Sequence, residues 1–252
     1  AKVEVGGLKP IQPLLDKVNA ITDVKSLVNT VSDLKKIGSN TLFSDYVYQD
    51  AKKSDAMAYN LSQGGLGLPE REYYFKTDSA TINIRNEYVK YITQILTMAG
   101  EDATVAATAA KNILALETKL ATASRKIEDL RDPYKNYNKM AITDLGKMAG
   151  NIDWVSYLKN TGVQKVDSVI VGQPEFFIAL NDALTKTPIS DWKQYVRFNL
   201  IRDMTPVLPD NYGVANFNFT KLFSGAKQRK PRWKHAIQME EDAMGEMLGQ
   251  LY

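Results

Sequence analysis

The segment from Gln63 to Tyr74 places the strongest constraint on the fold, because it combines three glycines, a proline and two adjacent tyrosines. Its glycines permit positive φ angles or a close approach of the backbone. Pro69 fixes its own φ angle and biases the residue before it toward an extended conformation. Leucines in such a turn favour packing over exposure, so we expect a packed corner. The residues expected to hold this corner against the core are Leu66, Leu68, Tyr73 and Tyr74.

A glycine-rich loop also prompts a phosphate-binding interpretation, but the spacing here does not match one. No lysine followed by serine or threonine comes after the last glycine, and no dinucleotide fingerprint opens a helix after a buried strand. We therefore interpret the segment as structural.

Apolar residues at helical spacing predict a mainly α fold, a multi-helix lobe with one small β-hairpin near residues 43–62. The hairpin strands are expected at 43–49 and 55–61, and one further strand at 166–171. A turn is expected over 132–140 and a loop over 211–225. Thr143, Asp153 and Ser190 are expected N-caps, and Pro174 is expected at a first helical position. The predicted helices cover residues 11–21, 23–38, 84–100, 102–120, 143–148, 153–158, 174–184, 190–200 and 231–252.

Glu117 lies on the helix predicted over 102–120, away from its apolar stripe. A lone carboxylate in that position is no catalytic candidate, so we expect it to face solvent.

Charge and composition exclude several classes of function. The net charge is +3, and the 32 basic and 29 acidic residues are largely interspersed, so no nucleic-acid partner is indicated. The basic run at residues 227–234 is interpreted as the solvated start of a helix rather than as a phosphate-binding patch. The chain has no cysteine and therefore no disulfide, thiolate metal site or cysteine nucleophile. No apolar stretch approaches the roughly 18 residues that predict a membrane span.

The last predicted helix carries apolar residues at helical spacing up to the end of the sequence, without a glycine cap or a polar tail. We expect that the chain was cut here or continues into another part. The apolar positions are Trp233, Ile237, Met244, Met247, Leu248 and Leu251.

The residues that zinc hydrolysis needs are missing from this sequence. His235 is the only histidine, so no His-Glu-x-x-His site is available. It precedes Glu240 and Glu241 by five and six residues, which does not fit a shared metal on one helix face. The serines lack a nucleophile-elbow context. We expect no catalytic and no metal-binding residue in this chain.

Several motifs in fixed order resemble the neprilysin family of zinc metallopeptidases, which includes endothelin-converting enzyme and bacterial oligoendopeptidase O types. The resemblance covers the amino-terminal, non-catalytic half of that family along nearly the whole chain. The matching segments are 63–69 with Arg71, Tyr73 and Tyr74; Arg131-Asp132-Pro133 with 137–140; Phe217-Asn218-Phe219; Ser224-Gly225; Pro231-Arg232-Trp233-Lys234; Met244-Gly245-Glu246; and Gly249-Gln250-Leu251-Tyr252.

The resemblance implies a helical cap lobe over residues 1–230 and a junction helix over 231–252 that leads into an absent catalytic lobe. It implies that peptides are cleaved in a chamber between the lobes, with zinc held by the catalytic lobe. We expect that lobe on a separate polypeptide, so that the two chains form a heterodimer and this chain alone is inactive. The expected location is extracytoplasmic, secreted or periplasmic in a bacterium.

Two other interpretations stay open: a stand-alone helical binding or scaffold module without peptidase activity, and a piece of a longer polypeptide. The substrate-binding residues are unknown at this point. Four polar residues within the matching motifs are expected to form structural hydrogen bonds rather than to contact substrate. They are Arg71, Tyr74, Asn138 and Arg232.

Overall fold

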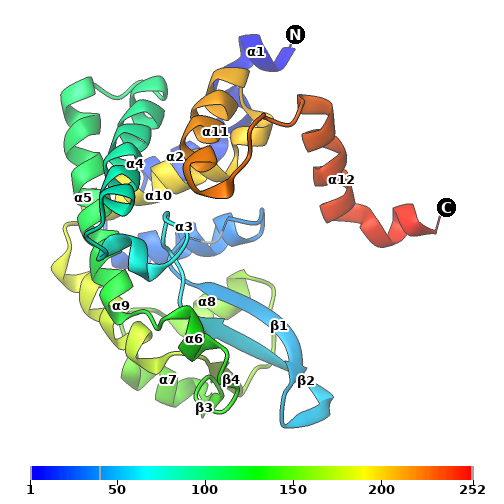
Figure 1. The fold of residues 1–252 in the computed structure, drawn as a ribbon. Coiled ribbons are helices and arrows are strands. Elements are labelled where there is room, and N and C mark those ends of the chain that lie inside the picture. The colour runs from blue at the N-terminus through cyan, green and yellow to red at the C-terminus, as the bar shows by residue number, and fades with distance from the viewer. Residues whose placement is uncertain (1, 40, 251–252) are drawn as a thin grey trace.

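The computed structural model describes residues 2–39 and 41–250, apart from the side chains of Lys2 and Leu248. Figure 1 shows helices around a small sheet that lies at one end of the molecule. The mainly α fold class is therefore confirmed. The α-helices are α1 (Lys2–Gly6), α2 (Gln12–Asn19), α3 (Val24–Lys35), α4 (Ser79–Met98), α5 (Ala103–Ala123), α6 (Ile127–Leu130), α7 (Ile142–Met148), α8 (Trp154–Asn160), α9 (Pro174–Lys186), α10 (Ile189–Asp203), α11 (Asp210–Ser224) and α12 (Arg232–Gly249).

The sheet has the strand order β1-β2-β4-β3. β1 and β2 form the predicted antiparallel hairpin, and β4 pairs with β2 in parallel. The prediction of a turn over 132–140 is wrong at its end, because β3 pairs antiparallel with β4. Such a short strand carries no readable alternation, and its partner lies far along the chain. The strands are β1 (Ser44–Asp50), β2 (Lys53–Ser62), β3 (Asn138–Ala141) and β4 (Ser168–Val171).

Two predicted helix starts are confirmed and two are wrong. Asp153 caps α8 by accepting from the Ser156 backbone, and Pro174 opens α9. The predicted caps Thr143 and Ser190 lie inside their helices, which begin at Ile142 and Ile189 instead. The residues before these helices are Ala141 and Pro188, whose side chains cannot cap a helix, so the nearest hydroxyl was wrongly predicted as the start.

The loop predicted over 211–225 is also wrong, because residues 210–224 form α11. Tyr212, Ala215 and Phe219 are buried, and their spacing of three and four residues is that of a helix face. The sequence between Tyr212 and Phe219 contains one glycine and two asparagines, whose low helix propensity makes the helix hard to predict. The Phe219 ring stacks on Tyr91 of α4 at a centroid distance of 4.9 Å, so packing stabilises this helix.

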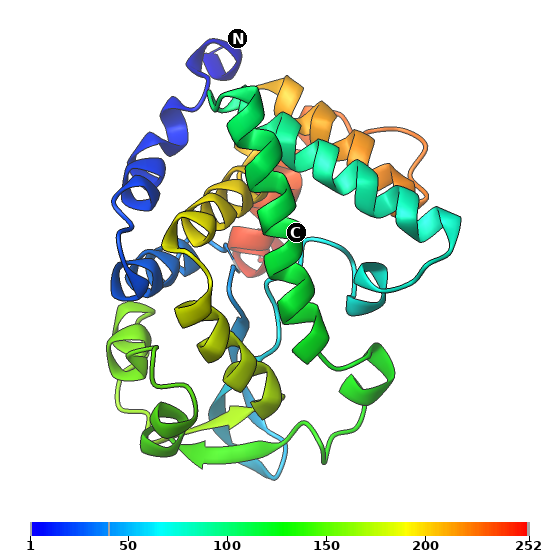
Figure 2. The same cartoon turned by 90° about the vertical axis from the view of Figure 1, so that its left-hand side faces the viewer.

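Helix α5 is the central element of the fold. It packs against α4, α9, α10 and the 3₁₀ helix η2 (Arg71–Tyr74). Figure 2 shows it running from the helical part of the molecule toward the part that contains the sheet. Its buried side chains form one face of the helix. They are Ala106, Ala109, Ala110, Ile113, Leu116, Glu117, Leu120 and Ala121.

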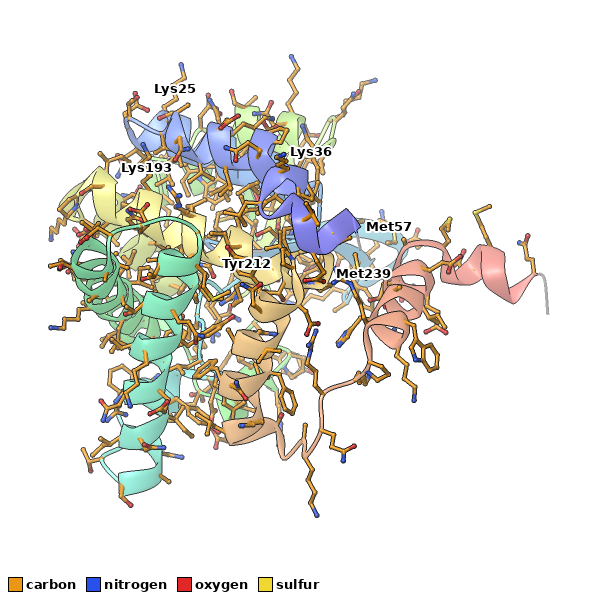
Figure 3. The ribbon with its side chains drawn as sticks, turned by 90° about the horizontal axis from the view of Figure 1, so that it is seen from above. Lys25, Lys36, Met57, Lys193, Tyr212 and Met239 are labelled. Atoms are coloured by element: carbon orange, nitrogen blue, oxygen red, sulfur yellow. The ribbon has the colours of Figure 1, made fainter. Side chains whose placement is uncertain are left out.

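Helix α12 stands apart from the other helices and reaches outward (Figure 1), and the view from above shows the same arrangement (Figure 3). Its main contact with the rest of the chain is with η3 (Thr205–Val207). The side chain of Leu248 and residues 251–252, which complete its predicted apolar stripe, lie outside the described residues. Across 2–39 and 41–250, no helix is both long and apolar enough to cross a membrane.

Candidate functional site at the root of helix α12

The glycine corner, residues 63–74, is held by a buried carboxylate that was expected in solvent. Glu117 has no exposed surface, so the prediction of a solvated position is wrong. Tyr74 donates to Glu117 Oε2 at 2.7 Å, and Tyr88 donates to Oε1 at 2.9 Å. The Tyr74 hydroxyl in turn accepts from the backbone N–H groups of Gly67 and Leu68, each at 3.1 Å. Glu117 therefore fixes the corner through Tyr74.

Burial raises the pKa of Glu117 to about 7, and the two tyrosine hydrogen bonds only partly oppose that rise. Its position on α5 contained a usable signal. Glu117 follows Ile113 by four residues and precedes Ala121 by four, so it lies within a wide buried face. The predicted apolar stripe was narrower than the face that α5 buries, so Glu117 was placed outside it.

The corner passes so close to neighbouring side chains that some of its positions admit only glycine. A Cβ atom on Gly67 would lie 1.8 Å from the Tyr88 hydroxyl. Gly65 has a φ angle of 74°, and a Cβ there would lie 2.6 Å from the Tyr195 hydroxyl. Leu68 and Tyr74 are buried, while Leu66 and Tyr73 pack against the core from partly exposed positions. The predicted packed corner is confirmed.

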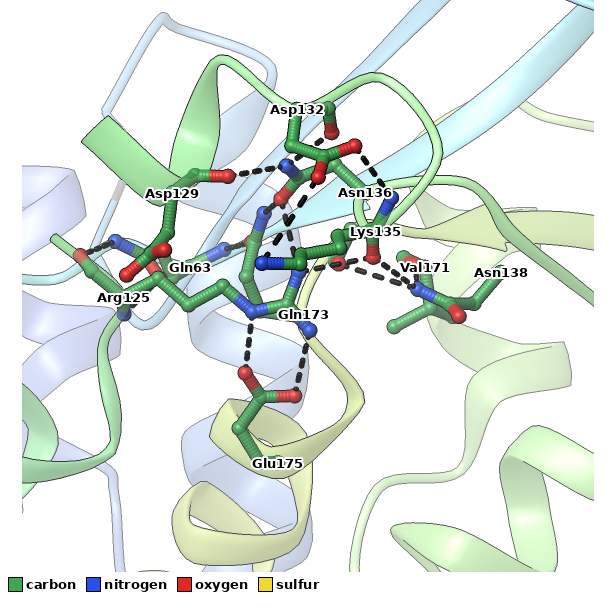
Figure 4. A network of polar contacts seen from close by, with 11 residues as sticks. Gln63, Arg125, Asp129, Asp132, Lys135, Asn136, Asn138, Val171, Gln173 and Glu175 are labelled. Carbon is green, nitrogen blue, oxygen red and sulfur yellow. Dashed lines mark hydrogen bonds and ion pairs between the residues drawn. The ribbon is translucent and has the colours of Figure 1, made fainter. Parts of the chain in front are cut away.

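A second set of polar contacts joins the corner to the sheet (Figure 4). The Gln63 side chain accepts from the Arg125 backbone at 2.7 Å and donates to its carbonyl at 3.0 Å. Arg125 Nη2 donates to Glu175 at 3.0 Å, and Gln173 accepts from the Gln63 backbone at 2.8 Å. Asn136 accepts from Gln173 at 2.6 Å. Because these groups bind one another, the network has a structural role.

The four polar residues of the motifs all form hydrogen bonds within the chain. Arg71 donates to the Ala121 carbonyl at 3.2 Å, and Asn138 donates to the Val171 carbonyl at 2.9 Å. Tyr74 belongs to the Glu117 cluster. Arg232 lies far from these three along the chain, at the start of α12.

The basic run 227–234, which we call the α12 root, is joined by two arginines to the rest of the chain, which we call the body. Arg229 donates to Asp210 at 2.6 Å, and Arg232 donates to Glu4 at 2.6 Å and to the Leu208 carbonyl at 2.9 Å. Glu4 also accepts from the Asp210 backbone at 3.0 Å. The other residues of the run are exposed, as expected, whereas these two arginines are partly exposed and ion-paired. They tie α1, α11 and α12 together and set the direction in which α12 leaves the body.

Gly213 on α11 makes room for one of these contacts. A Cβ atom at this position would lie 2.6 Å from the Arg229 guanidinium. Glycine inside a helix costs stability relative to alanine, so its presence here is explained by the arginine that crosses it. Nothing in the local sequence pattern identifies this role, because Arg229 is distant along the chain.

A pocket of about 200 Å³ lies between η3, α11 and the α12 root. Apolar side chains and basic groups both line it, including Phe217, Leu208, Lys230 and His235. Beyond the pocket α12 exposes large apolar side chains: Trp233 is 60% exposed and Met247 is 66% exposed. Exposed apolar side chains of this kind make α12 a candidate interaction surface.

The described residues offer no place for zinc. Within them, no group of three or more His, Cys, Asp or Glu side chains is arranged to hold a metal ion. His235 lines the pocket beside the α12 root, and the described side chains lining that pocket include no Asp, Glu or Cys and no second His.

Comparison with known proteins gives a family for this chain. The family model described as "Peptidase family M13", in its amino-terminal part, matches residues 1–252. The chain belongs to peptidase family M13. The resemblance to the amino-terminal half of neprilysin-like peptidases is thereby confirmed. Endothelin-converting enzyme 1 of Cavia porcellus is 26% identical over 264 residues, which cover all of this chain and 35% of that enzyme.

Solved structures agree with M13 membership. A crystal structure of the Mycobacterium tuberculosis zinc metalloprotease Zmp1 with an inhibitor superposes with a TM-score of 0.94 at 28% identity, covering 99% of this chain and 38% of Zmp1. PepO of Lactobacillus rhamnosis shares the fold, with a TM-score of 0.81 at 17% identity over 96% of this chain and 38% of PepO. This M13 chain thus spans about a third of the length of the curated relatives it matches.

Proposed function

We propose that this M13 chain is the non-catalytic cap lobe of a zinc-dependent endopeptidase, which closes over peptides while another part hydrolyses them. The single observation that supports this most is the superposition of nearly the whole chain on part of a zinc metalloprotease. The proposal assigns residues 1–230 to the cap and 231–252 to the junction with the catalytic part. It assigns no catalytic or metal-binding role to any residue here.

The zinc site belongs to a catalytic part outside this sequence, on a separate polypeptide that forms a heterodimer with this chain. Zinc in such an enzyme polarises the scissile carbonyl and activates a water molecule. The residues of this chain do not fit that role, because the described part has no metal-binding group. An extracytoplasmic location, secreted or periplasmic, goes with this function.

The exposed apolar side chains of α12 support a partner at that helix. Trp233, Ile237 and Met244 are each at least 44% exposed. Burying such side chains against a partner favours association, so we place the contact with the catalytic part at α12.

The test is intact-mass and zinc analysis of the protein purified under native conditions. A second polypeptide with about one zinc per complex, and peptidase activity lost to a chelator, would support every part of the proposal. Zinc and activity on one longer polypeptide would support the cap function and exclude the separate chain. A metal-free 28.2 kDa species without peptidase activity would overturn the proposal in favour of a binding module.

A further inference from the structure

The charges of α12 run in the order opposite to the one that stabilises a helix by itself. Its first turn contains Arg232 and Lys234 and no acidic residue, and its last turn contains no basic residue. Acidic residues follow instead in its outer half, at 240–242 and at Glu246. Because the N-terminus of a helix carries partial positive charge, basic groups there and acidic groups toward the C-terminus are unfavourable.

Neighbouring helices of the same chain follow the favourable order. α9, α10 and α11 each have an acidic residue in the first turn and a basic residue in the last. In α11 these are Asp210 and Lys221. The reversed order in α12 is therefore not a general feature of this chain, and it calls for a source of stabilisation outside the helix.

The basic groups of the α12 root divide into two sets. The arginines are engaged with Asp210 and Glu4 of the body. Lys227, Lys230 and Lys234 are exposed and form no ion pair within the described part of the chain. The arginines orient the root, and the lysines are left to face a partner.

Exposed apolar side chains are interspersed with the charged residues of α12, and Ile237 and Met239 lie between its basic start and the acidic residues at 240–242. Trp233 and Ile237 lie four residues apart on one helix face, whereas Met244 lies at a kink where the backbone leaves helical geometry (φ −139°). All three are exposed. A surface with an apolar centre and charged ends has the composition of a protein interface with a polar rim.

We propose that α12 is a polarised docking helix whose occupant is the catalytic part of this M13 peptidase. The partner surface presents acidic groups to Lys227, Lys230 and Lys234, and basic groups to the outer half that carries Glu246. Opposite charges fix the register of the helix on that surface, since a shifted or inverted helix would bring like charges together. This proposal rests on the proposed function, but adds the chemistry and polarity of the partner surface.

The test compares four forms of the complete protein or complex by hydrogen exchange of the α12 backbone amides. The root variant carries Lys227→Glu, Lys230→Glu and Lys234→Glu. The swapped variant adds Glu240→Lys, Glu241→Lys and Glu246→Lys, which restores the formal net charge and places added acidic groups at the root and added basic groups in the outer half of α12. The control carries Lys25→Glu, Lys111→Glu and Lys119→Glu, which are exposed lysines on α3 and α5.

We expect α12 amides to exchange at least about tenfold faster in the root and swapped variants than in wild type. Their exchange rate should be unchanged in the control. Exchange in wild type should also rise between about 0.05 and 0.5 M NaCl, because salt screens the charges. Equal or slower exchange in the swapped variant would overturn the proposal, since it would mean that helix stability alone protects α12. Rapid exchange in the wild-type complex would overturn it as well. Zinc content and peptidase activity of wild type decide the proposed function separately.

Discussion

The Tyr74 hydroxyl lies 2.7 Å from Glu117 Oε2 and joins the glycine corner to the central helix α5. The same hydroxyl accepts from two backbone N–H groups of the corner. One phenol thus connects the most constrained turn of the chain to a carboxylate with no exposed surface. Both residues are buried, so changes to either one are expected to affect the whole lobe.

Glu117 should make the stability of the lobe depend on pH. Its pKa is raised from 4.5 to about 7 in the folded chain, so the folded state holds the proton more tightly than the unfolded state. The free energy of unfolding therefore falls as pH rises from 4.5 to about 7, by about 3 kcal/mol, and this contribution is constant above that range.

Glu117→Gln should remove this dependence, because the amide does not titrate. Urea denaturation at several pH values gives the free energy of unfolding of wild type and variant, and the difference between the two should change with pH. Glu128→Gln on α6 is the matched control, since that side chain is exposed. A difference between wild type and Glu117→Gln that stays constant across the range would contradict the prediction.

Tyr74→Phe should destabilise the lobe by about 2 kcal/mol or more, because it leaves a buried carboxylate oxygen and backbone N–H groups without their partner. Thermal or urea unfolding measures the change. Tyr134→Phe should change stability by less than about 0.5 kcal/mol, because Tyr134 is 81% exposed. Equal effects of the two substitutions would show that the Tyr74 hydroxyl does not hold the corner.

Gly67→Ala should be strongly destabilising, by about 3 kcal/mol or more, because the new methyl group overlaps the buried Tyr88 ring. Gly146→Ala is the control: this glycine lies in α7 with no atom within 4 Å of an added Cβ. There alanine should stabilise by about 0.5–1 kcal/mol through helix propensity. Soluble expression and unfolding midpoints of both variants check the prediction, which a stable Gly67→Ala protein would refute.

Gly213→Ala should disturb the α12 root, although alanine favours a helix. The added methyl group displaces Arg229 from Asp210. The hydrogen bond from Arg229 is the largest cause that holds the pKa of Asp210 below its ordinary value, so that pKa should rise in the variant. A carboxyl NMR titration measures it, with Asp153 as internal reference, because Ser156 lowers the pKa of that group independently. An unchanged pKa of Asp210 would mean that the arginine can move aside without losing its contact.

Local patterns in the sequence were sufficient for much of the fold. The hairpin near 43–62 follows from two short strand-like runs around a polar connection, and the Asp153 cap follows from one carboxylate and the backbone beside it. The corner at 63–74 follows from three glycines that permit its conformation and a proline that restricts the backbone beside them. Each of these features depends on residues close together in the chain, so the sequence determined them by itself.

Contacts between distant segments decided the rest. β3 exists because it pairs with β4, and α11 is stabilised by stacking on α4. Glu117 is buried because Tyr74 and Tyr88, from two other elements, supply its hydrogen bonds. Arg229 pairs with Asp210, which lies nineteen residues earlier in the chain, and it passes over Gly213 to do so. Only the tertiary structure brings such groups together, because their stabilisation exists only after the chain has folded.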